Sequence, residues 1–275
     1  MKIRVPATTA NIGPGFDTMG IALNLYNYFE LEEKKEKKTL ADIAFGKYFE
    51  YIGKDIPNYS VKILDSEIPI ARGLGSSASL IVGGIALANN LNNNYLSDIE
   101  ILEIAIEVEG HPDNVTPAIF GGLCVSAVRD DKAFYCKREI DDSLNFVTFI
   151  PPYEVPTQKA RSVLPKEIDY KKAIENMSNT AMIISLIGEK NYKDLSSFLH
   201  DNLHEPFRKE LIKDYDSIKE ISKNYGSIGT YISGSGPTMI SLTLEEDFIE
   251  KLNDEKLSDI KILELKCDNE GYVVL

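Results

Sequence analysis

The sequence predicts an α+β protein with two lobes, because its helical and strand-like patterns come in blocks and not in strict alternation. Three observations support this fold class. The odd positions from Ile21 to Leu31 are mainly apolar, which is typical of a long, half-buried strand. A strongly apolar helix over 77–91 opens directly from a glycine-rich loop. Pro151 and Pro152 can continue neither a helix nor a central strand, so we divide the chain there, into lobes 1–150 and 151–275.

The remaining elements follow from local patterns in chain order. Ser97 and Glu100 form a capping box, which predicts the start of a helix. In the first lobe the other predicted elements are strands at 3–5, 61–64, 123–128 and 146–150 and a helix at 40–52. In the second lobe the patterns predict helices at 169–188, 192–200, 207–224 and 246–256 and strands at 228–232, 239–242 and 260–265.

The composition is that of an acidic globular protein. Of its 275 residues 43% are hydrophobic and 27% charged, and 30 Lys and Arg against 43 Asp and Glu give a net charge of −13. Such a charge repels nucleic acid and anionic membranes, so we expect neither as a partner. The only basic cluster contains Lys34, Lys35, Lys37 and Lys38, and it is short enough to predict a solvated hairpin tip.

Two further features predict a cytoplasmic protein. The chain starts directly in a strand pattern, and its longest nearly apolar run, 79–88, is about half a membrane span. Its three cysteines, Cys124, Cys136 and Cys267, are odd in number and far apart, which predicts neither a disulfide framework nor a zinc site.

The most informative stretch is a glycine-rich loop that leads into the apolar helix. It comprises Pro69, Ile70, Ala71, Arg72, Gly73, Leu74, Gly75, Ser76, Ser77, Ala78 and Ser79. Gly73 and Gly75 allow the backbone to come close to a ligand, and the free N–H groups of a helix N-terminus suit phosphate. The stretch is neither a Walker A loop nor a GxGxxG motif. The alternative is a tight turn with close helix packing.

A second stretch, Glu109 to Val115, offers two carboxylates, an imidazole and an amide within six residues. Glu109 suits Mg²⁺, a hard cation that prefers carboxylate, hydroxyl and phosphate oxygens. His111 either contacts a ligand or stabilises the turn. The alternative for the whole stretch is a Gly-Pro turn with polar caps that ends a helix.

Two more loops carry weaker signals. Residues 229–238 form a glycine-rich loop between two strands, and residues 6–17 place Asn11 and Asp17 on a turn rich in Gly and Pro. Each either binds a polar ligand or caps a sheet. His200 and His204 have the i, i+4 spacing of zinc ligands, but Asp201 stands where a zinc-protease motif has glutamate, so we predict a polar helix face.

Taken together and in this order, the stretches 6–17, 69–79, 109–115 and 229–238 resemble the GHMP small-molecule kinases. Within that superfamily the first and third stretches are similar to the branch that acts on L-homoserine. The resemblance implies a ribosomal-S5-like N-terminal lobe and a ferredoxin-like C-terminal lobe, with the active site between them. It also implies ATP-dependent phosphorylation of the L-homoserine side-chain hydroxyl to O-phospho-L-homoserine, on the route to threonine.

The resemblance further implies roles for particular residues. The 69–79 loop would bind the ATP phosphates, and Ser77 with a glutamate would hold Mg²⁺. We prefer Glu109 for that glutamate, and an ungapped alignment would select Glu103. The substrate would be bound by Asn11, Asp17, Asn114, Arg161 and Arg208, with the two arginines on its carboxylate and with Asn114 and Asp17 as the catalytic pair.

An amide cannot accept a proton at neutral pH, so Asn114 is expected to orient the substrate and not to act as a base. A homodimer is left open. Two rival functions remain at this point: another enzyme of the superfamily, such as a mevalonate-type kinase, and a nucleotide-binding protein without transferase activity. The presence of Ser77, Glu109 and Asp17 argues against the second.

Overall fold

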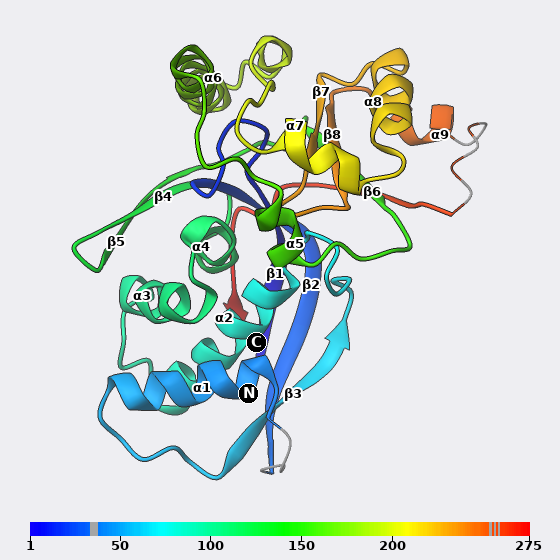
Figure 1. Ribbon diagram of the computed structural model, residues 1–275. Helices are drawn as coiled ribbons and strands as arrows, with labels where there is room; N and C mark the ends of the chain where they lie inside the picture. The colour runs from blue at the N-terminus through cyan, green and yellow to red at the C-terminus, as the bar shows by residue number, and fades with distance from the viewer. Residues whose placement is uncertain (34–37, 253–254, 256, 258) are drawn as a thin grey trace.

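The computed structural model describes residues 1–33, 38–252, 255, 257 and 259–275, and its strands form two antiparallel sheets (Figure 1). The first sheet has the order β10-β1-β2-β4-β5, and β3 also pairs with β2. Its strands are β1 (Lys2–Ala10), β2 (Met19–Glu33), β3 (Tyr59–Ser66), β4 (Leu123–Arg129), β5 (Lys132–Arg138) and β10 (Val273–Val274). The predicted basic hairpin tip, with Lys34, Lys35 and Lys37, lies outside the described residues.

The second sheet has the order β7-β8-β6-β9. Its strands are β6 (Asn145–Ile150), β7 (Gly229–Ile232), β8 (Met239–Thr243) and β9 (Lys261–Leu265). The predicted division after residue 150 therefore does not coincide with the break between the sheets. β6 pairs with β8 and β9, whereas β10 returns from the end of the chain to pair with β1.

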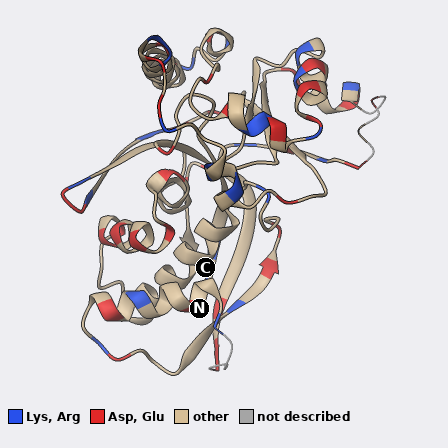
Figure 2. Cartoon of the chain, viewed as in Figure 1, with Lys and Arg blue, Asp and Glu red and all other residues tan. Residues whose placement is uncertain are grey.

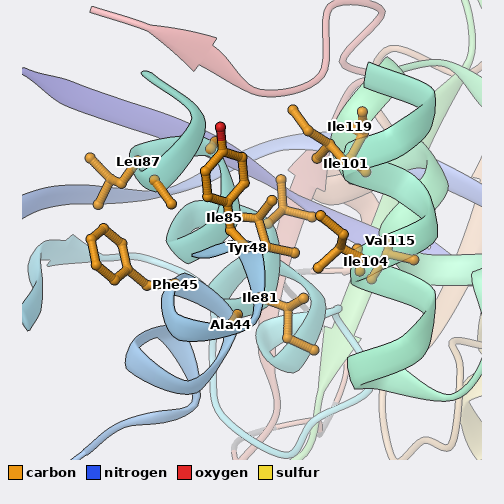
Figure 3. Close-up of a cluster of buried hydrophobic side chains, with 14 of the residues drawn as sticks. Ala44, Phe45, Tyr48, Ile81, Ile85, Leu87, Ile101, Ile104, Val115 and Ile119 are labelled. Carbon is orange, nitrogen blue, oxygen red and sulfur yellow. The ribbon is translucent and has the colours of Figure 1, made fainter. Parts of the chain in front are cut away.

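Four helices cover the first sheet: α1 (Leu40–Tyr51), α2 (Ser76–Leu91), α3 (Asp98–Glu109) and α4 (Pro112–Phe120). α2 and α4 pack on β1 and β2, and α1 and α3 pack outside them. Figure 3 shows their shared core, to which α1 contributes Phe45 and Tyr48, α2 contributes Ile85 and α3 contributes Ile104. Because these side chains are fully or almost fully buried, the core fixes how α1, α2 and α3 pack against one another.

The second sheet carries α5 (Thr157–Ser162), α6 (Tyr170–Gly188), α7 (Glu205–Arg208), α8 (Tyr215–Asn224) and α9 (Phe248–Leu252), with 3₁₀ turns at Lys193–Ser197 and Lys209–Leu211. Figure 2 shows Lys and Arg interspersed with Asp and Glu over these helices and the outer hairpins. Among the described residues, no helix combines the length and the apolar character needed to cross a bilayer.

The structure confirms the predicted strands and the capping box of α3, and it corrects the sequence reading in three places. The stretch after Gly110 is the helix α4 and not only a turn, because Pro112 occupies its first position, where the missing N–H costs nothing. The predicted helix at 192–200 is only a short 3₁₀ turn at Lys193–Ser197. The predicted helix at 207–224 is split, since α7 ends at Arg208 and α8 begins at Tyr215.

Candidate active site

A cavity of about 490 Å³ lies where the two sheets' loops meet, and residues from all four singled-out stretches line it. The predicted site residues that line it are Asn11, Asp17, Ile70, Ala71, Arg72, Gly73, Gly75, Ser76, Ser77, Glu109, Asn114, Arg161 and Arg208. Those outside the lining are Pro69, which is half-buried, and Leu74, Ala78 and Ser79, which are buried in the fold. Lining residues that were not singled out individually are Leu40, Leu80, Asp113, Thr157, Gly234 and Ser235.

The glycine-rich loop is clamped between β1 and the loop after β7. Gly73 and Gly75 have φ angles of +83° and +68°, in the left-handed region. A Cβ on Gly73 would lie 2.3 Å from the Ser233 carbonyl oxygen, and one on Gly75 would lie 1.9 Å from Thr8 Oγ1. The Ser233 hydroxyl also donates to the Gly73 carbonyl (2.6 Å). Close approach of the neighbouring chain segments therefore requires glycine at both positions.

This clamp gives α2 an open N-terminus. Gly75 is the residue that precedes the helix, and no side chain caps it. The first N–H groups of a helix lack acceptors within the helix, and the macrodipole makes that end favourable for anions. Ser76 and Ser77, which begin the helix, line the cavity. The arrangement suits a phosphate group.

We expect Gly75→Ala to destabilise the protein by about 2–5 kcal/mol, because a strained φ angle and an overpacked contact add. Gly53→Ala is the matched control. Gly53 has a φ angle of +66°, but nothing lies within 4 Å of its Cβ position, so this variant carries the strain without the clash with Thr8. Chemical denaturation of the two variants measures the difference. Equal losses would show that the contact with Thr8 does not matter.

A hydroxyl and a carboxylate meet where α2 begins and α3 ends. Ser77 Oγ donates to Glu109 Oε2 at 2.7 Å. Burial raises the pKa of Glu109, and the hydrogen bond from Ser77 opposes that shift. Glu103, on the same helix, is outside the cavity lining and accepts from the backbone N–H of Ala133 (3.4 Å). The structure thus groups Glu109 with Ser77, and it places Glu103 against β5.

The chemistry of this pair fits Mg²⁺, which takes one or two carboxylates and completes its shell with phosphate and water oxygens. Within the described parts of the chain, no group of three or more His, Cys, Asp and Glu side chains is placed to hold a metal ion. At this pair the chain would contribute one carboxylate and one hydroxyl. A magnesium ion that arrives with a polyphosphate needs no more.

The start of α4 carries a chain of hydrogen bonds along the cavity wall. His111 Nδ1 lies 2.6 Å from Asp113 Oδ1, and this bond is the main reason that the pKa of His111 is raised. Thr8 Oγ1 donates to Asn114 Oδ1 at 2.8 Å. The Asn114 amide is thereby held with its oxygen toward β1. His111 lines the cavity, and its bond to Asp113 also lies within the turn.

The opposite end of the cavity is lined by paired charges. Both Asp17 oxygens accept from Arg161, through Nη1 and Nη2 at 2.9 Å each. Asn11 Oδ1 accepts from the backbone N–H of Asp17 (3.1 Å). Arg208 is buried, and it donates from Nη1 to the Gly234 carbonyl (2.8 Å) and from Nε to the Ala160 carbonyl (3.1 Å). Burial lowers the pKa of Arg208 to about 10, which leaves it charged at neutral pH.

The predicted polar helix face with His200 and His204 is wrong. His204 is fully buried, because Asp201 folds the chain back by accepting from the backbone N–H groups of His204 and Glu205 (2.7 Å each). His204 Nε2 donates to the Gly13 carbonyl at 2.9 Å, and its ring stacks on Phe16 at 5.2 Å. His204 therefore supports the loop that carries Asn11 and Asp17. Asp201 stands four residues before the pair Glu205 and Pro206, and this spacing is the sequence feature that could have predicted the turn.

Comparison with protein-family models places this fold in a known class. Residues 34–122 match the model of the GHMP kinases N terminal domain, and residues 183–257 match that of the GHMP kinases C terminal. The open N-terminus of α2 lies in the first of these segments, and the cavity is lined by residues of both segments together with Asn11, Asp17, Thr157 and Arg161 from outside them. The fold and the site thus define a GHMP kinase, as the four stretches of sequence predicted.

Relatives that match this chain over nearly their full length show which branch of the GHMP kinases it belongs to. A homoserine kinase of Clostridium botulinum (strain Langeland) is 40% identical over 296 residues, which cover 100% of this chain and 98% of that protein. A homoserine kinase of Clostridium acetobutylicum is 36% identical, with 100% of both chains covered. The crystal structure of homoserine kinase from Cytophaga hutchinsonii superposes with a TM-score of 0.88 at 26% identity, covering 100% of this chain and 97% of that one. The chain belongs to the homoserine kinase family.

Proposed function

We propose that this protein transfers the γ-phosphoryl group of ATP to the side-chain hydroxyl of L-homoserine and releases O-phospho-L-homoserine and ADP. One observation carries the proposal beyond family membership. A single cavity has an uncapped helix N-terminus, which favours phosphate, at one end and both signs of fixed charge at the other. An amino acid with a hydroxyl side chain fits between them, because its ammonium and carboxylate need partners of opposite sign.

The phosphate end would hold the nucleotide. The loop 69–79 supplies backbone N–H groups, and Ser77 with Glu109 would hold Mg²⁺. When bound, Mg²⁺ neutralises charge on the transferring phosphoryl group. In a protein of net charge −13, the local positive end of α2 gives the polyphosphate a favourable place to bind.

The other end would hold the amino acid. In this structure Asp17 and Arg161 form a salt bridge in which each Asp17 oxygen accepts a hydrogen bond from one Nη atom of Arg161. When a zwitterionic amino acid binds, two new ion pairs would replace this salt bridge. The ammonium would pair with Asp17, and the carboxylate would pair with Arg161. Arg208 lines the same end, and its Nη2 has no hydrogen-bond partner among the described residues. We therefore assign the carboxylate to Arg161 and Arg208, and the ammonium to Asp17 and Asn11.

Asn114 would orient the reacting hydroxyl. Its Oδ1 accepts from Thr8, so its Nδ2, which lies 3.4 Å from Asp113 Oδ1, is the group available to a substrate oxygen. Phosphoryl transfer needs little covalent help from the protein, and in-line positioning with charge stabilisation accounts for most of the rate. Asn114 and Asp17 would thus be catalytic residues by contact with the substrate, and neither has to take a proton if the hydroxyl proton leaves on an oxygen of the transferred phosphoryl group.

A coupled ADP-release assay tests the function directly. We expect turnover with L-homoserine and Mg·ATP, and only background rates with mevalonate or shikimate. Turnover with mevalonate and not with homoserine would refute the substrate. A protein that binds ATP and turns over none of the three acceptors would be a nucleotide-binding protein without transferase activity.

We expect Asn114→Ala to lower kcat by about 2–12-fold, the effect of one neutral hydrogen bond, without moving the acid limb of the pH–rate profile. An amide has no proton to lose near neutral pH, so its removal cannot remove a titration. The profile of kcat/KM against pH is the measurement. Loss of a pKa present in the wild-type profile would mean that Asn114 governs a catalytic proton.

A further inference from the structure

Two guanidinium groups share one aromatic ring at the wall of the cavity. Phe16 is half-buried and lies in the loop between β1 and β2, which Figure 1 shows reaching from the first sheet toward α6 and α7. Cζ of Arg208, at the end of α7, lies over the Phe16 ring at 5.0 Å from its centroid. Cζ of Arg161, on α5, lies over the same ring at 5.7 Å. Three segments that are distant in sequence therefore meet at one benzene ring.

The ring is a suitable partner for the buried charge of Arg208. The face of a benzene ring carries partial negative charge and attracts a guanidinium, more strongly where water is excluded. Arg208 is buried, and within the described part of the chain no carboxylate forms an ion pair with it. Its hydrogen bonds go to the carbonyls of Ala160 and Gly234. The charge of Arg208 is therefore compensated at short range by neutral groups, and the Phe16 ring is one of them.

The ring also offers Arg161 a contact that substrate binding would not remove. Among the described residues, Asp17 alone accepts hydrogen bonds from the Arg161 guanidinium, at 2.9 Å each. An ammonium group that takes over Asp17 would break this pair. Burial lowers the pKa of Arg208, and the positive charge of Arg161 adds to that shift, so the two guanidiniums repel each other. A benzene ring is at most a weak hydrogen-bond acceptor, so it can attract both without competing with a carboxylate for their N–H groups.

The Phe16 ring is itself held in place. The ring of His204 stacks on it, with centroids 5.2 Å apart and an angle of 27° between the planes. His204 is fully buried, and its bond to the Gly13 carbonyl fixes it to the same loop. Burial lowers the pKa of His204, so the imidazole is neutral at pH 7 and adds no third positive charge. The aromatic face is thus in position before any substrate arrives.

From this arrangement we propose that Phe16 is a positioning residue for the phosphoryl acceptor, because its ring face holds the guanidiniums of Arg161 and Arg208 where both reach the substrate carboxylate. The inference rests on the proposed function, since it takes an amino acid as the ligand of the two arginines. Phe16 touches no reacting atom. It acts by reducing the ordering that the two long side chains must undergo when a carboxylate binds, and such preorganisation increases affinity.

Ring fluorination tests the role of the aromatic face. In the full-length protein, Phe16 is replaced by phenylalanines that carry one, two or three ring fluorines, which withdraw electron density from the face and hardly change the shape. We expect kcat/KM for L-homoserine to fall at each step, by about 2–30-fold in total, the usual range for a cation–π contact. The KM for ATP should stay constant. The rate with 3-aminopropanol, which has the amine and hydroxyl of homoserine but no carboxylate, should also stay constant along the series.

Three further variants control the measurement. The same fluorine series at Phe198 is the matched control, because Phe198 is half-buried against an apolar cluster and no Lys or Arg in the described ranges lies over its ring. It should leave kcat/KM unchanged. Phe16→Leu keeps an apolar side chain without the aromatic face, and it should lose as much as the trifluoro variant. In an Arg161→Ala background the Phe16 series should have a smaller effect, since only Arg208 then lies over the ring.

The outcomes separate this role from the proposed function. If the wild type phosphorylates L-homoserine and the fluorine series at Phe16 is flat, the positioning role is wrong and the proposed function stands. Equal losses on L-homoserine and 3-aminopropanol would also overturn the role, because the ring would then support the loop and not the carboxylate site. A wild-type protein that does not turn over L-homoserine would refute the proposed function, and the role of Phe16 with it.

Discussion

Glu109→Gln should lower kcat by about 10²–10³-fold and raise the Mg²⁺ concentration needed for half-maximal rate. Removing one group that stabilises developing charge costs this much in enclosed sites. Glutamine has nearly the same shape, and its amide oxygen can still accept from Ser77 Oγ, which lies 2.7 Å from the carboxylate in the wild type. The substitution therefore removes the charge that would hold the metal while it leaves the contact between α2 and α3 in place. Steady-state kinetics at several Mg²⁺ concentrations measure both effects.

Glu103→Gln provides the control on the same helix. Glu103 lies outside the cavity lining and accepts a long bond from the Ala133 backbone, so we expect wild-type kinetics from this variant. Ser77→Ala should change the same parameters as Glu109→Gln, by a smaller factor. If Glu103→Gln changed the Mg²⁺ dependence while Glu109→Gln kept wild-type kinetics, the ungapped alignment, which assigns Glu103 to the metal, would be correct.

Thermal stability separates this catalytic loss from a folding defect. Burial raises the pKa of Glu109 above its unfolded value, so its ionisation disfavours the folded state, and that cost grows as the pH rises through the raised pKa. Glutamine cannot ionise and carries no such cost. Glu109→Gln should therefore melt no lower than the wild type at neutral pH, even though it is nearly inactive. A carboxylate that costs stability and supports activity is typical of functional sites.

The parts of the site that sequence predicted are those whose chemistry is local. Gly73 and Gly75 precede an apolar helix, and this order predicts a helix N-terminus suited to an anion; in the structure α2 begins directly after Gly75 with no side-chain cap. Glu109 and Asn114 flank one Gly-His-Pro turn, so their proximity also follows from spacing. Such short-range signals do not depend on how distant segments pack.

The parts that sequence missed depend on long-range contacts. β6 follows β5 in the chain but joins the second sheet, and the strand that completes the first sheet comes from residues 273–274. His204 is buried because the Gly13 carbonyl and the Phe16 ring lie across from it, about 190 residues away in sequence. Hydrophobic periodicity reports which face of an element is buried, and it does not report against what.

The pairing of Asp17 with Arg161 is another long-range contact, and it leads to a prediction about substrate binding. Replacing Arg161 by alanine should lower kcat/KM for L-homoserine by about 10–150-fold, because a hydrogen bond to a charged group contributes roughly 1.5–3 kcal/mol. The KM for ATP should hardly change. Arg161→Lys should recover part of the loss, since an ammonium supplies charge without the planar fork that binds a carboxylate at two points.

Arg208 requires a gentler change. It is 2% exposed, and it donates to the carbonyls of Gly234 and Ala160, so alanine would remove both of these bonds, although the Gly234 carbonyl would still accept from Asn11 Nδ2. Arg208→Ala should therefore lower both kcat/KM, by a similar 10–150-fold factor, and the melting temperature. Arg208→Lys, which keeps a donor in place, should preserve more of the fold than of the activity. Comparing the two variants separates the structural role of this side chain from its role toward substrate.

The carboxyl-free analogue 3-aminopropanol decides what both arginines recognise. It keeps the amine and the hydroxyl of homoserine, so it would still reach Asp17 and Asn114, and it lacks only the group assigned to Arg161 and Arg208. We expect it to be a poor substrate of the wild-type protein and to be turned over almost equally well by Arg161→Ala. Equal losses on both substrates would mean that Arg161 serves the phosphates or the fold. A loss confined to homoserine would locate the carboxylate at the end of the cavity where Arg161 and Arg208 both face Phe16, at 5.7 and 5.0 Å from its ring.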